Sequence, residues 1–281
     1  MPELPEVETI RKGLEEYLIG HTIIDVEVRL PKIVQGDISE VKGGKIVSVR
    51  RFGKGLVIDL DNGYLLAIHI KLTGQLIYAG KKIPQKVKVI KQLYSSLPNK
   101  WTHVIFHLDQ GETLFYNDFR QFGWIKIIPQ GDLKKLVFFK ELGPEFFRDL
   151  TLELFEKIIK KSNTSIKPLL IDQKKISGVG NIYSNDALSL AKIDPRRKAS
   201  SLTSDEIKCL YESLETVLKR GLQYGGASEL SYINALGGEG SYQKHFLVYG
   251  RQGQKCFNCG GTIEKIQLGG RGTYFCKLCQ K

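Results

Sequence analysis

Residues 256–279 read CFNCGGTIEKIQLGGRGTYFCKLC, in which two Cys-x2-Cys pairs are separated by sixteen residues. Each pair offers two thiolates from a tight turn, and the spacer has the length of a β-hairpin. The pattern predicts one structural zinc ion held by Cys256, Cys259, Cys276 and Cys279. Two disulfides are the alternative, which a cytoplasmic chain disfavours. Four protein ligands leave no open position, so we expect this zinc to stabilise the hairpin and not to catalyse.

The module around these cysteines is strongly basic. Residues 241–281 contain seven Lys or Arg against one acid, a net charge of +6, which is half of the +12 carried by all 281 residues. An excess of this size indicates a polyanionic partner, with solvated surface charge as the plainer interpretation. At the expected hairpin tip, Arg271 lies between glycines. It is placed either to reach a phosphate or to remain a solvated turn residue.

Before this module, apolar residues recur at helical spacing. Thr203 and Glu206 have the spacing of a capping box that opens the longest predicted helix. Asn181 precedes another helical pattern, so N-capping is a sufficient structural reason for it, and a helix N-terminus is also an anion site. From the Gly143-Pro144 break onward, the spacing predicts helices over 152–161, 165–171, 182–191 and 204–224.

The first half of the chain has the pattern of a β-sandwich. A helix over residues 5–19 comes first, and residues 80–100, basic and polar with two prolines, predict a long surface loop. Short runs with period two, separated by Asx-Gly-type turns, predict strands within 22–28, 56–60, 64–70, 103–108 and 113–116. We therefore expect an α+β protein with four parts: a sandwich over 1–130, a linker over 131–150, a helical domain over 151–240 and the zinc hairpin over 241–281.

The composition excludes several classes of protein. Hydrophobic residues make up 42% of the chain, which is typical of a folded globular protein and not of a disordered one. No apolar run approaches the roughly 18 residues of a membrane span, and the acidic first ten residues lack the basic start of a signal peptide. We expect a monomeric cytoplasmic protein without a membrane partner.

The N-terminal sequence MPELPEVETI combines a proline with several acids. Helix physics explains Pro5 and Glu6 near a helix start, but it does not require Pro2 and Glu3. Removal of Met1 would expose a secondary α-amine, whose ordinary pKa of about 8 leaves it partly neutral at pH 7. Such an amine can attack an anomeric carbon and form a charged iminium, while adjacent carboxylates move protons. Simple entry into the helix is the alternative.

Four separated motifs together resemble one family of DNA-repair enzymes. They are Met1-Pro2-Glu3-Leu4-Pro5-Glu6-Val7-Glu8-Thr9, Arg51-Phe52-Gly53-Lys54-Gly55, Gly178-Val179-Gly180-Asn181-Ile182-Tyr183 and Gly270-Arg271-Gly272-Thr273-Tyr274-Phe275-Cys276. In this order they resemble the bacterial formamidopyrimidine-DNA glycosylases over essentially the whole chain. Leu4 favours this family over the related endonuclease VIII, which usually has glycine there. The resemblance implies a helix-two-turn-helix domain, a zinc finger and damaged double-stranded DNA as the partner.

The resemblance also implies an activity, base excision repair. The family removes oxidised purines such as 8-oxoguanine and formamidopyrimidines, and then nicks the strand by successive β- and δ-elimination. Solvated turn charge is the alternative role for Lys54, a role that Arg50 and Arg51 could equally have. The implied catalytic residues are the nucleophile Pro2, the general acid/base Glu3, the supporting Glu6, and Lys54, which contacts phosphate beside the lesion.

Further residues match the family's DNA contacts. In the family a methionine, an arginine and a phenylalanine fill the hole left by the flipped nucleotide. In His69-Ile70-Lys71-Leu72-Thr73-Gly74, the position that matches this methionine holds Leu72, and Met1 is the only methionine of the chain. Leucine has a similar volume but is stiffer. Ordinary core packing is the alternative for Leu72 and Phe122. The implied contacts are His69, Asn181, Tyr249 and Arg271 on phosphates and Leu72, Arg120 and Phe122 in the stack.

Two other functions remain open on the sequence. One is a non-catalytic protein that binds damaged DNA on the same scaffold, against which the intact Pro2-Glu3 pair argues. The other is an enzyme of the same class that prefers oxidised pyrimidines.

Overall fold

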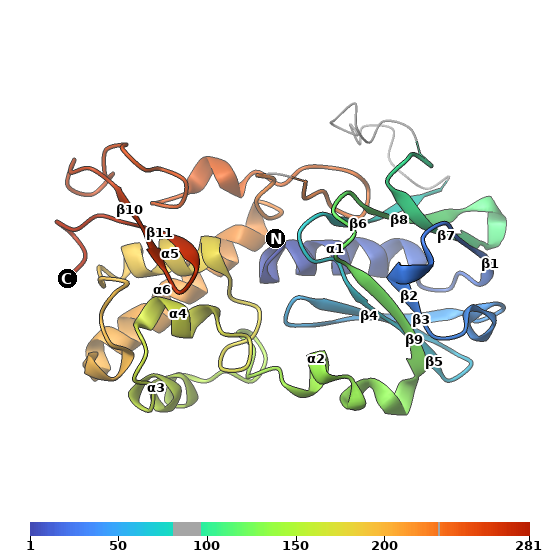
Figure 1. Cartoon of the computed structure of the whole chain (residues 1–281), viewed down its shortest axis with the longest axis horizontal. Coiled ribbons are helices and arrows are strands. Elements are labelled where there is room, and N and C mark those ends of the chain that lie inside the picture. Colours follow the sequence, from blue (N-terminus) through green and yellow to red (C-terminus); the bar gives the residue numbers. More distant parts are fainter. Residues whose placement is uncertain (81–96, 230) are drawn as a thin grey trace. The chain divides into compact units, whose positions relative to one another are not determined.

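The computed structural model describes residues 1–80, 97–229 and 231–281, which form two compact units (Figure 1). Most of the surface loop predicted over 80–100 lies outside the described residues. The domain boundaries expected at residues 130, 150 and 240 stay a prediction. The first unit comprises Met1–Lys140 and Tyr224–Gln243, and the second comprises Glu141–Gln223 and Lys244–Lys281. The chain therefore returns to the first unit after its long helix.

The first unit is a sandwich of two sheets with a flanking helix, α1 (Leu4–Leu18). One sheet has the strand order β1-β7-β8-β6 and the other β2-β9-β5-β4-β3. All pairings are antiparallel except the short one between β2 and β9. The strands are β1 Ile23–Val28, β2 Val34–Gln35, β3 Ile46–Phe52, β4 Gly55–Leu60, β5 Tyr64–His69, β6 Gly74–Ala79, β7 Thr102–Leu108, β8 Thr113–Asp118 and β9 Trp124–Pro129.

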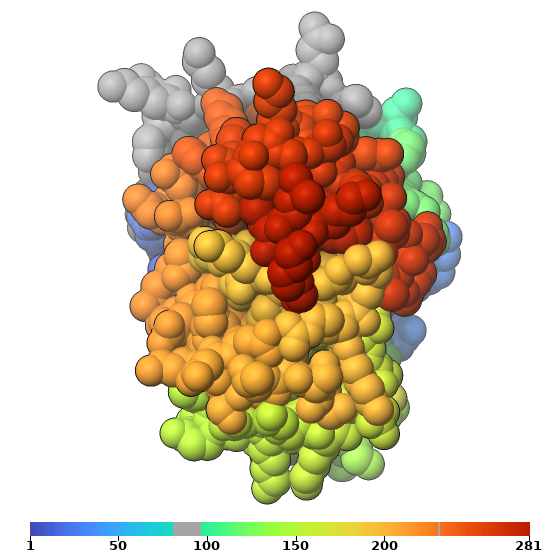
Figure 2. All heavy atoms as spheres, turned by 90° about the vertical axis from the view of Figure 1, so that its left-hand side faces the viewer, coloured from blue at the N-terminus to red at the C-terminus, as the bar shows by residue number. Residues whose placement is uncertain are grey.

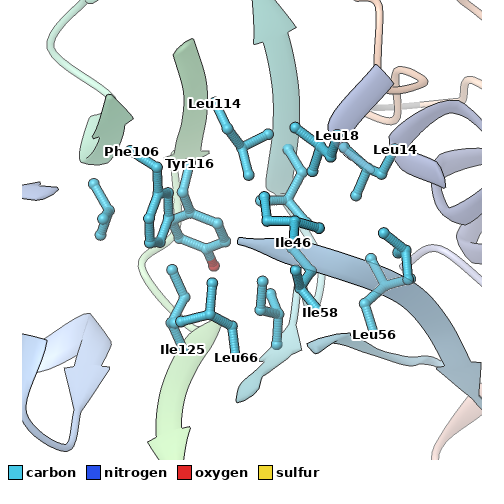
Figure 3. Close-up of a cluster of buried hydrophobic side chains, with 14 of the residues drawn as sticks. Leu14, Leu18, Ile46, Leu56, Ile58, Leu66, Phe106, Leu114, Tyr116 and Ile125 are labelled. Carbon is cyan, nitrogen blue, oxygen red and sulfur yellow. The ribbon is translucent and has the colours of Figure 1, made fainter. Parts of the chain in front are cut away.

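The core of this unit lies between the two sheets and under α1. Side chains alternate between the faces of each strand, so the apolar positions of both sheets point inward. Leu14 and Leu18 of α1 belong to the same buried cluster as Ile58 of one sheet and Phe106 and Tyr116 of the other (Figure 3). Each is at most 2% exposed, and burying a side chain of this size contributes roughly 1.5–3 kcal/mol. The packing fixes α1, and with it the position of the N-terminus.

Both units also contain short helices. The α-helix α2 spans Val137–Lys140. The 3-10 helices are η1 Pro31–Ile33, η2 Ile38–Val41, η3 Asp109–Gly111, η4 Gln130–Lys135, η5 Ala199–Ser201 and η6 Tyr242–His245.

The second unit is helical and ends in a hairpin. Thr203 and Glu206 form the predicted capping box: the Thr203 N–H donates to Glu206 Oε2 at 2.8 Å, and the Glu206 N–H donates to Thr203 Oγ1 at 3.2 Å. The C-terminal residues, red in Figure 2, lie over the yellow and orange helical residues of the same unit. The elements are α3 Leu152–Lys160, α4 Ile166–Ile171, α5 Asn181–Leu190, α6 Ser204–Gln223, β10 Glu264–Leu268 and β11 Arg271–Phe275.

The predicted hairpin between the cysteine pairs is confirmed. Strands β10 and β11 pair from Glu264 opposite Phe275 to Leu268 opposite Arg271. The two-residue turn between them has positive φ at both positions, which glycine adopts without strain. Among the described residues, no helix is long and apolar enough to cross a membrane.

Candidate active site

The start of α1 places two acidic side chains in the interior of the first unit. Glu3 is the N-cap and is 3% exposed, and Glu6 is 1% exposed. The two form a capping box, in which the Glu3 N–H donates to Glu6 Oε2 at 2.7 Å. The other oxygen of Glu6 accepts the Ala227 N–H at 2.8 Å. Both Glu6 oxygens therefore hold backbone N–H groups, and Pro2 is buried immediately before this pair.

The terminal α-amine lies in the field of the same residues. Burial lowers the pKa of the Met1 α-amine below its ordinary value of 8.0; Glu3 and Glu6 oppose this shift, and Lys54 adds to it. A lower pKa leaves more of an amine neutral, which is its nucleophilic form. The structure thus brings the N-terminus, two carboxylates and one lysine to one place. The catalytic roles expected for Pro2, Glu3, Glu6 and Lys54 stay a prediction.

Lys54 lies in the turn between β3 and β4 and is 4% exposed. Gly53 before it has φ +56°, a conformation that favours glycine. A Cβ at Gly55 after it would lie 2.7 Å from the ring of Phe138. The glycines on both sides are therefore needed for the backbone of this turn.

Arg50 and Arg51, which could also have been solvated turn charges, have acidic partners. Arg51 pairs with Glu8 of α1 at 2.8 Å, and Arg50 pairs with Asp59 at 2.5 Å. Arg51 also donates to the carbonyl of Gly53 at 2.9 Å. Arg51 therefore fixes the turn that carries Lys54 against α1.

His69 ends β5 and is 4% exposed. Burial lowers the pKa of His69 to about 3, and the nearby Lys71 and Lys54 add to this shift. His69 Nδ1 is 2.9 Å from the Lys71 N–H and accepts from it, so the neutral ring carries its proton on Nε2. The ring also packs edge-on against Phe138, with centroids 4.8 Å apart. His69 can therefore donate one hydrogen bond without carrying charge.

The three residues predicted to fill the stack lie on two loops of the first unit, which we call the wedge loops. Leu72 is on the loop over 70–73 and is half-buried, whereas Arg120 and Phe122 are on the loop over 119–123 and are exposed. Phe122 is 53% exposed, and the Arg120 guanidinium lies 4.8 Å from the centre of its ring. The alternative of core packing is therefore wrong for Phe122.

In the second unit, Asn181 connects α5 to the hairpin. Asn181 Oδ1 accepts from Lys167 Nζ at 2.6 Å, and its Nδ2 donates to the carbonyl of Gly272 at 3.1 Å. The N-cap of α5 is Gly180, so the capping role predicted for Asn181 is wrong. Its side chain is used by partners that are distant in sequence, and Lys167 is fully buried beside it.

Arg271 and Tyr249 lie on the same unit. Arg271 is exposed as the first residue of β11, next to the hairpin turn. Tyr249 is half-buried, and its N–H donates to Asp186 Oδ1 at 3.2 Å. Its ring lies against that of Tyr274 on the hairpin, with centroids 5.2 Å apart.

Sequence reasoning did not single out Lys167, Asn185 or Asp186. Asn185 Oδ1 accepts the N–H of Tyr274 at 2.7 Å, and Asp186 Oδ1 accepts the N–H of Tyr249. All three side chains are at most 1% exposed. A usable signal was present, because each is a polar or charged residue at a position where the helical pattern calls for an apolar one.

The four cysteines form a compact cluster. All four Sγ atoms lie within 4.8 Å of one another, and Cys256 to Cys279 and Cys259 to Cys276 are separated by 3.9 and 3.5 Å. Tetrahedral zinc with Zn–S bonds of about 2.3 Å requires sulfurs about 3.8 Å apart. The cluster fits one zinc ion, as the sequence predicts.

Comparisons with known proteins agree with these observations. Residues 1–125 match the formamidopyrimidine-DNA glycosylase N-terminal domain, residues 142–231 match the H2TH domain of the same enzymes, and residues 253–281 match a zinc finger found in FPG and IleRS. The formamidopyrimidine-DNA glycosylase of Pelotomaculum thermopropionicum is 42% identical, and the match covers 100% of this chain and 99% of that protein.

Solved structures give the same result. A mutant of Lactococcus lactis FPG in complex with DNA containing Fapy-dG has a TM-score of 0.87 and 34% identity, with 100% of both chains covered. The wild-type Lactococcus lactis protein in complex with DNA containing an oxidised pyrimidine has a TM-score of 0.86 at the same identity and coverage. Because the likeness extends over the whole length in sequence and in fold, the chain belongs to the formamidopyrimidine-DNA glycosylase family.

Proposed function

We propose that this protein is a bifunctional DNA glycosylase and AP lyase of base excision repair, which removes 8-oxoguanine and formamidopyrimidines from double-stranded DNA. One observation carries the proposal: the buried start of α1 gathers Pro2, the carboxylates of Glu3 and Glu6, and Lys54. A protein that only binds damaged DNA has no use for this arrangement. Burying an acid is costly unless it is hydrogen-bonded or paired, and buried acids grouped with a lysine are typical of sites that transfer protons.

The reaction starts at Pro2 after removal of Met1. The Pro2 amine attacks the anomeric carbon of the damaged nucleotide, and the bond to the base breaks as the base leaves with a proton supplied by Glu3. Glu3 then takes the proton of the Pro2 nitrogen and passes it to O4′ as the C1′–O4′ bond breaks, which opens the sugar and leaves an iminium between Pro2 and C1′. This iminium is positively charged, so it acidifies the adjacent sugar C–H. Loss of that proton expels the 3′ phosphate, and a second elimination expels the 5′ phosphate. Glu6 holds the Glu3 backbone throughout.

The remaining predicted residues bind the DNA. Lys54 contacts phosphate as a cation, and His69 contacts it as a neutral donor through Nε2. On the second unit, the phosphate contacts are Asn181, Tyr249 and Arg271. Leu72, Arg120 and Phe122 fill the space of the flipped nucleotide, and the exposure of the last two leaves them available for it. The zinc ion bound by the four cysteines fixes the hairpin next to Arg271. Because its substrate is chromosomal DNA, we expect the enzyme in the bacterial cytoplasm, bound to the nucleoid.

Borohydride trapping tests the mechanism. With a duplex containing 8-oxoguanine opposite cytosine, we expect reduction of the iminium to give a covalent protein–DNA complex. A single residue added before Pro2 should abolish trapping, whereas the same residue added after Lys281 should not. Trapping by the N-terminally extended protein would exclude Pro2 as the nucleophile. Tight binding of the lesion without cleavage by the processed protein would favour the binding-only function.

An oxidised pyrimidine is a second candidate substrate, since a related protein has been solved on such DNA. Competition between duplexes carrying 8-oxoguanine and thymine glycol, at equal concentration and in one reaction, separates the two. We expect 8-oxoguanine to be removed first, and the reverse order would reassign the substrate to pyrimidines.

A further inference from the structure

One buried carboxylate joins the two wedge loops beneath their tips. Asp118, the last residue of β8, is fully buried. Its Oδ1 accepts the hydroxyl of Thr73 and, at 3.2 Å, the N–H of Arg120. Its Oδ2 accepts the N–H of Gly123 at 2.8 Å. The same side chain thus holds the loop that carries Leu72 and the loop that carries Arg120 and Phe122.

Thr73 is the direct bridge between the loops. Its hydroxyl donates to Asp118 and accepts the N–H of Arg120 at 2.9 Å. A hydroxyl can do both at once because it has one proton and two lone pairs. The residue next to Leu72 is therefore bonded to the backbone of Arg120, 47 positions along the chain.

Each wedge loop also contains a residue in a left-handed backbone conformation. Lys71 has φ +50° and Gln121 has φ +56°, and each is adjacent to a wedge residue. Non-glycine residues persist in this region only where neighbouring groups hold them. His69 Nδ1 accepts the N–H of Lys71 at 2.9 Å, and the Asp118 carbonyl accepts the N–H of Gln121 at 3.3 Å.

Asp118 is itself fixed in the sheet, and the loop beyond it has no spare room. Its N–H donates to the carbonyl of Trp101 at 3.0 Å, and His103 Nε2 lies 2.8 Å from its carbonyl oxygen. A Cβ on Gly123 would lie 1.9 Å from Tyr116 Oη. The carboxylate is therefore a rigid anchor for both loops.

We propose that Thr73 and Asp118 are positioning residues that make the two wedge loops act as one body. Leu72 then fills the stack in the same event in which Arg120 meets the opposite base. This inference rests on the proposed glycosylase function. An extruded nucleotide has lost its stacking and pairing. To keep it out of the duplex, the hole must be filled and the opposite base must be held at the same time. Neither positioning residue touches the reacting atoms.

The test compares Thr73→Val, which keeps the shape and removes the hydroxyl, with Thr73→Ser, which keeps the hydroxyl. The duplex carries 8-oxoguanine beside 2-aminopurine, whose fluorescence rises when the stack opens. Thr73→Val should reduce the amplitude of this rise and slow single-turnover excision about 2- to 12-fold, the worth of one hydrogen bond. It should also reduce the preference for 8-oxoguanine opposite cytosine over adenine. Thr73→Ser should restore all three.

A second substrate separates positioning from general damage to the fold. Single-stranded DNA with a preformed abasic site has no opposite base that the loops must hold. Thr73→Val should therefore leave the rate of elimination on this substrate unchanged. Equal loss on this substrate and on the duplex would overturn the proposal, as would wild-type fluorescence and base preference in Thr73→Val. The variant Asp118→Asn keeps one oxygen acceptor. Like Thr73→Val, it should lose excision on the duplex and keep the wild-type rate of elimination on the single strand. A wild-type protein that excises nothing would instead remove the proposed function.

Discussion

At the scale of the residue, hydrogen bonding divides the two acids of the N-terminus. Both oxygens of Glu6 accept backbone N–H groups, one from Glu3 and one from Ala227. These two bonds hold the Glu6 side chain in place. In the capping box the Glu3 side chain accepts one backbone N–H, that of Glu6. Because both of its oxygens hold backbone groups, Glu6 is suited to fix the backbone, and we assign proton transfer to Glu3.

This division predicts different losses in two matched variants. Glu3→Gln removes the proton donor and should slow base excision by roughly 100-fold or more, the usual contribution of a general acid. Glu6→Gln keeps the shape but places an amide N–H₂ against one of two backbone N–H groups. It should lower the free energy of unfolding by about 1–3 kcal/mol and slow excision less. Single-turnover excision and urea denaturation measure the two effects. A greater loss of excision in Glu6→Gln than in Glu3→Gln would reverse the assignment.

His69 should make the protein less stable in acid. Its pKa in the folded protein is about 3, against about 6.5 for an unfolded histidine. Because the folded pKa is depressed, its stabilisation is complete above pH 6.5 and is lost as the pH falls toward 3. The difference in unfolding free energy between wild type and His69→Gln should shrink by about 1.4 kcal/mol per pH unit in this window. Urea denaturation at pH 7, 5.5 and 4.5 measures it, and a constant difference would contradict a neutral buried His69.

At the scale of the element, prediction from sequence worked for helices whose signals lie within the segment. The helices over 152–161 and 204–224 were predicted within one residue of their observed ends, because their apolar spacing and the Thr203–Glu206 capping box are contained in the segment itself. The hairpin followed from the cysteine spacing in the same way.

Long-range partners set the limit of that reasoning. Asn181 fits a local rule for N-caps, yet its side chain donates to Gly272, 91 residues away. Thr73 and Asp118 are 45 residues apart, and neither has a pattern of its own. The proposed DNA contacts follow from motifs, whereas the residues that position them depend on contacts that only the fold creates.

One such long-range contact, between Asn185 and the Tyr274 N–H, holds the hairpin on α5. Asn185→Ala removes the acceptor for the Tyr274 N–H and leaves a half-buried donor without this partner, which costs up to about 1–3 kcal/mol. We expect weaker DNA binding with the zinc content unchanged, since no cysteine is altered. Ser189→Ala on the same helix is the control and should bind as wild type. Fluorescence anisotropy with a lesion duplex and zinc analysis of both variants test this. Loss of zinc together with affinity would show that Asn185 supports the metal site instead.

At the scale of the whole molecule, the basic residues and the acids of the proposed chemistry lie in different places. The chain carries +12, and residues 241–281 hold half of it on the module that zinc stabilises. The acids of the proposed chemistry are buried at the start of α1, where they do not oppose the approach of DNA. In the proposed mechanism, one chain performs acid–base chemistry on a polyanion. This requires Glu3 and Glu6 to be buried and the cations to lie on the surface.

The salt dependence of DNA binding follows from which contacts carry charge. Each phosphate neutralised by a cation contributes about −0.9 to the slope of log K against log salt, because it releases condensed counterions. Arg271→Gln removes such a cation, so it should weaken binding and make the slope shallower by about 0.9. His69 is neutral at pH 7, so His69→Gln should weaken binding and leave the slope unchanged. Titrations from 50 to 200 mM salt distinguish the two. Equal slopes for wild type and Arg271→Gln would remove Arg271 from the phosphate contacts, and a shallower slope for His69→Gln would mean that His69 binds DNA as a cation.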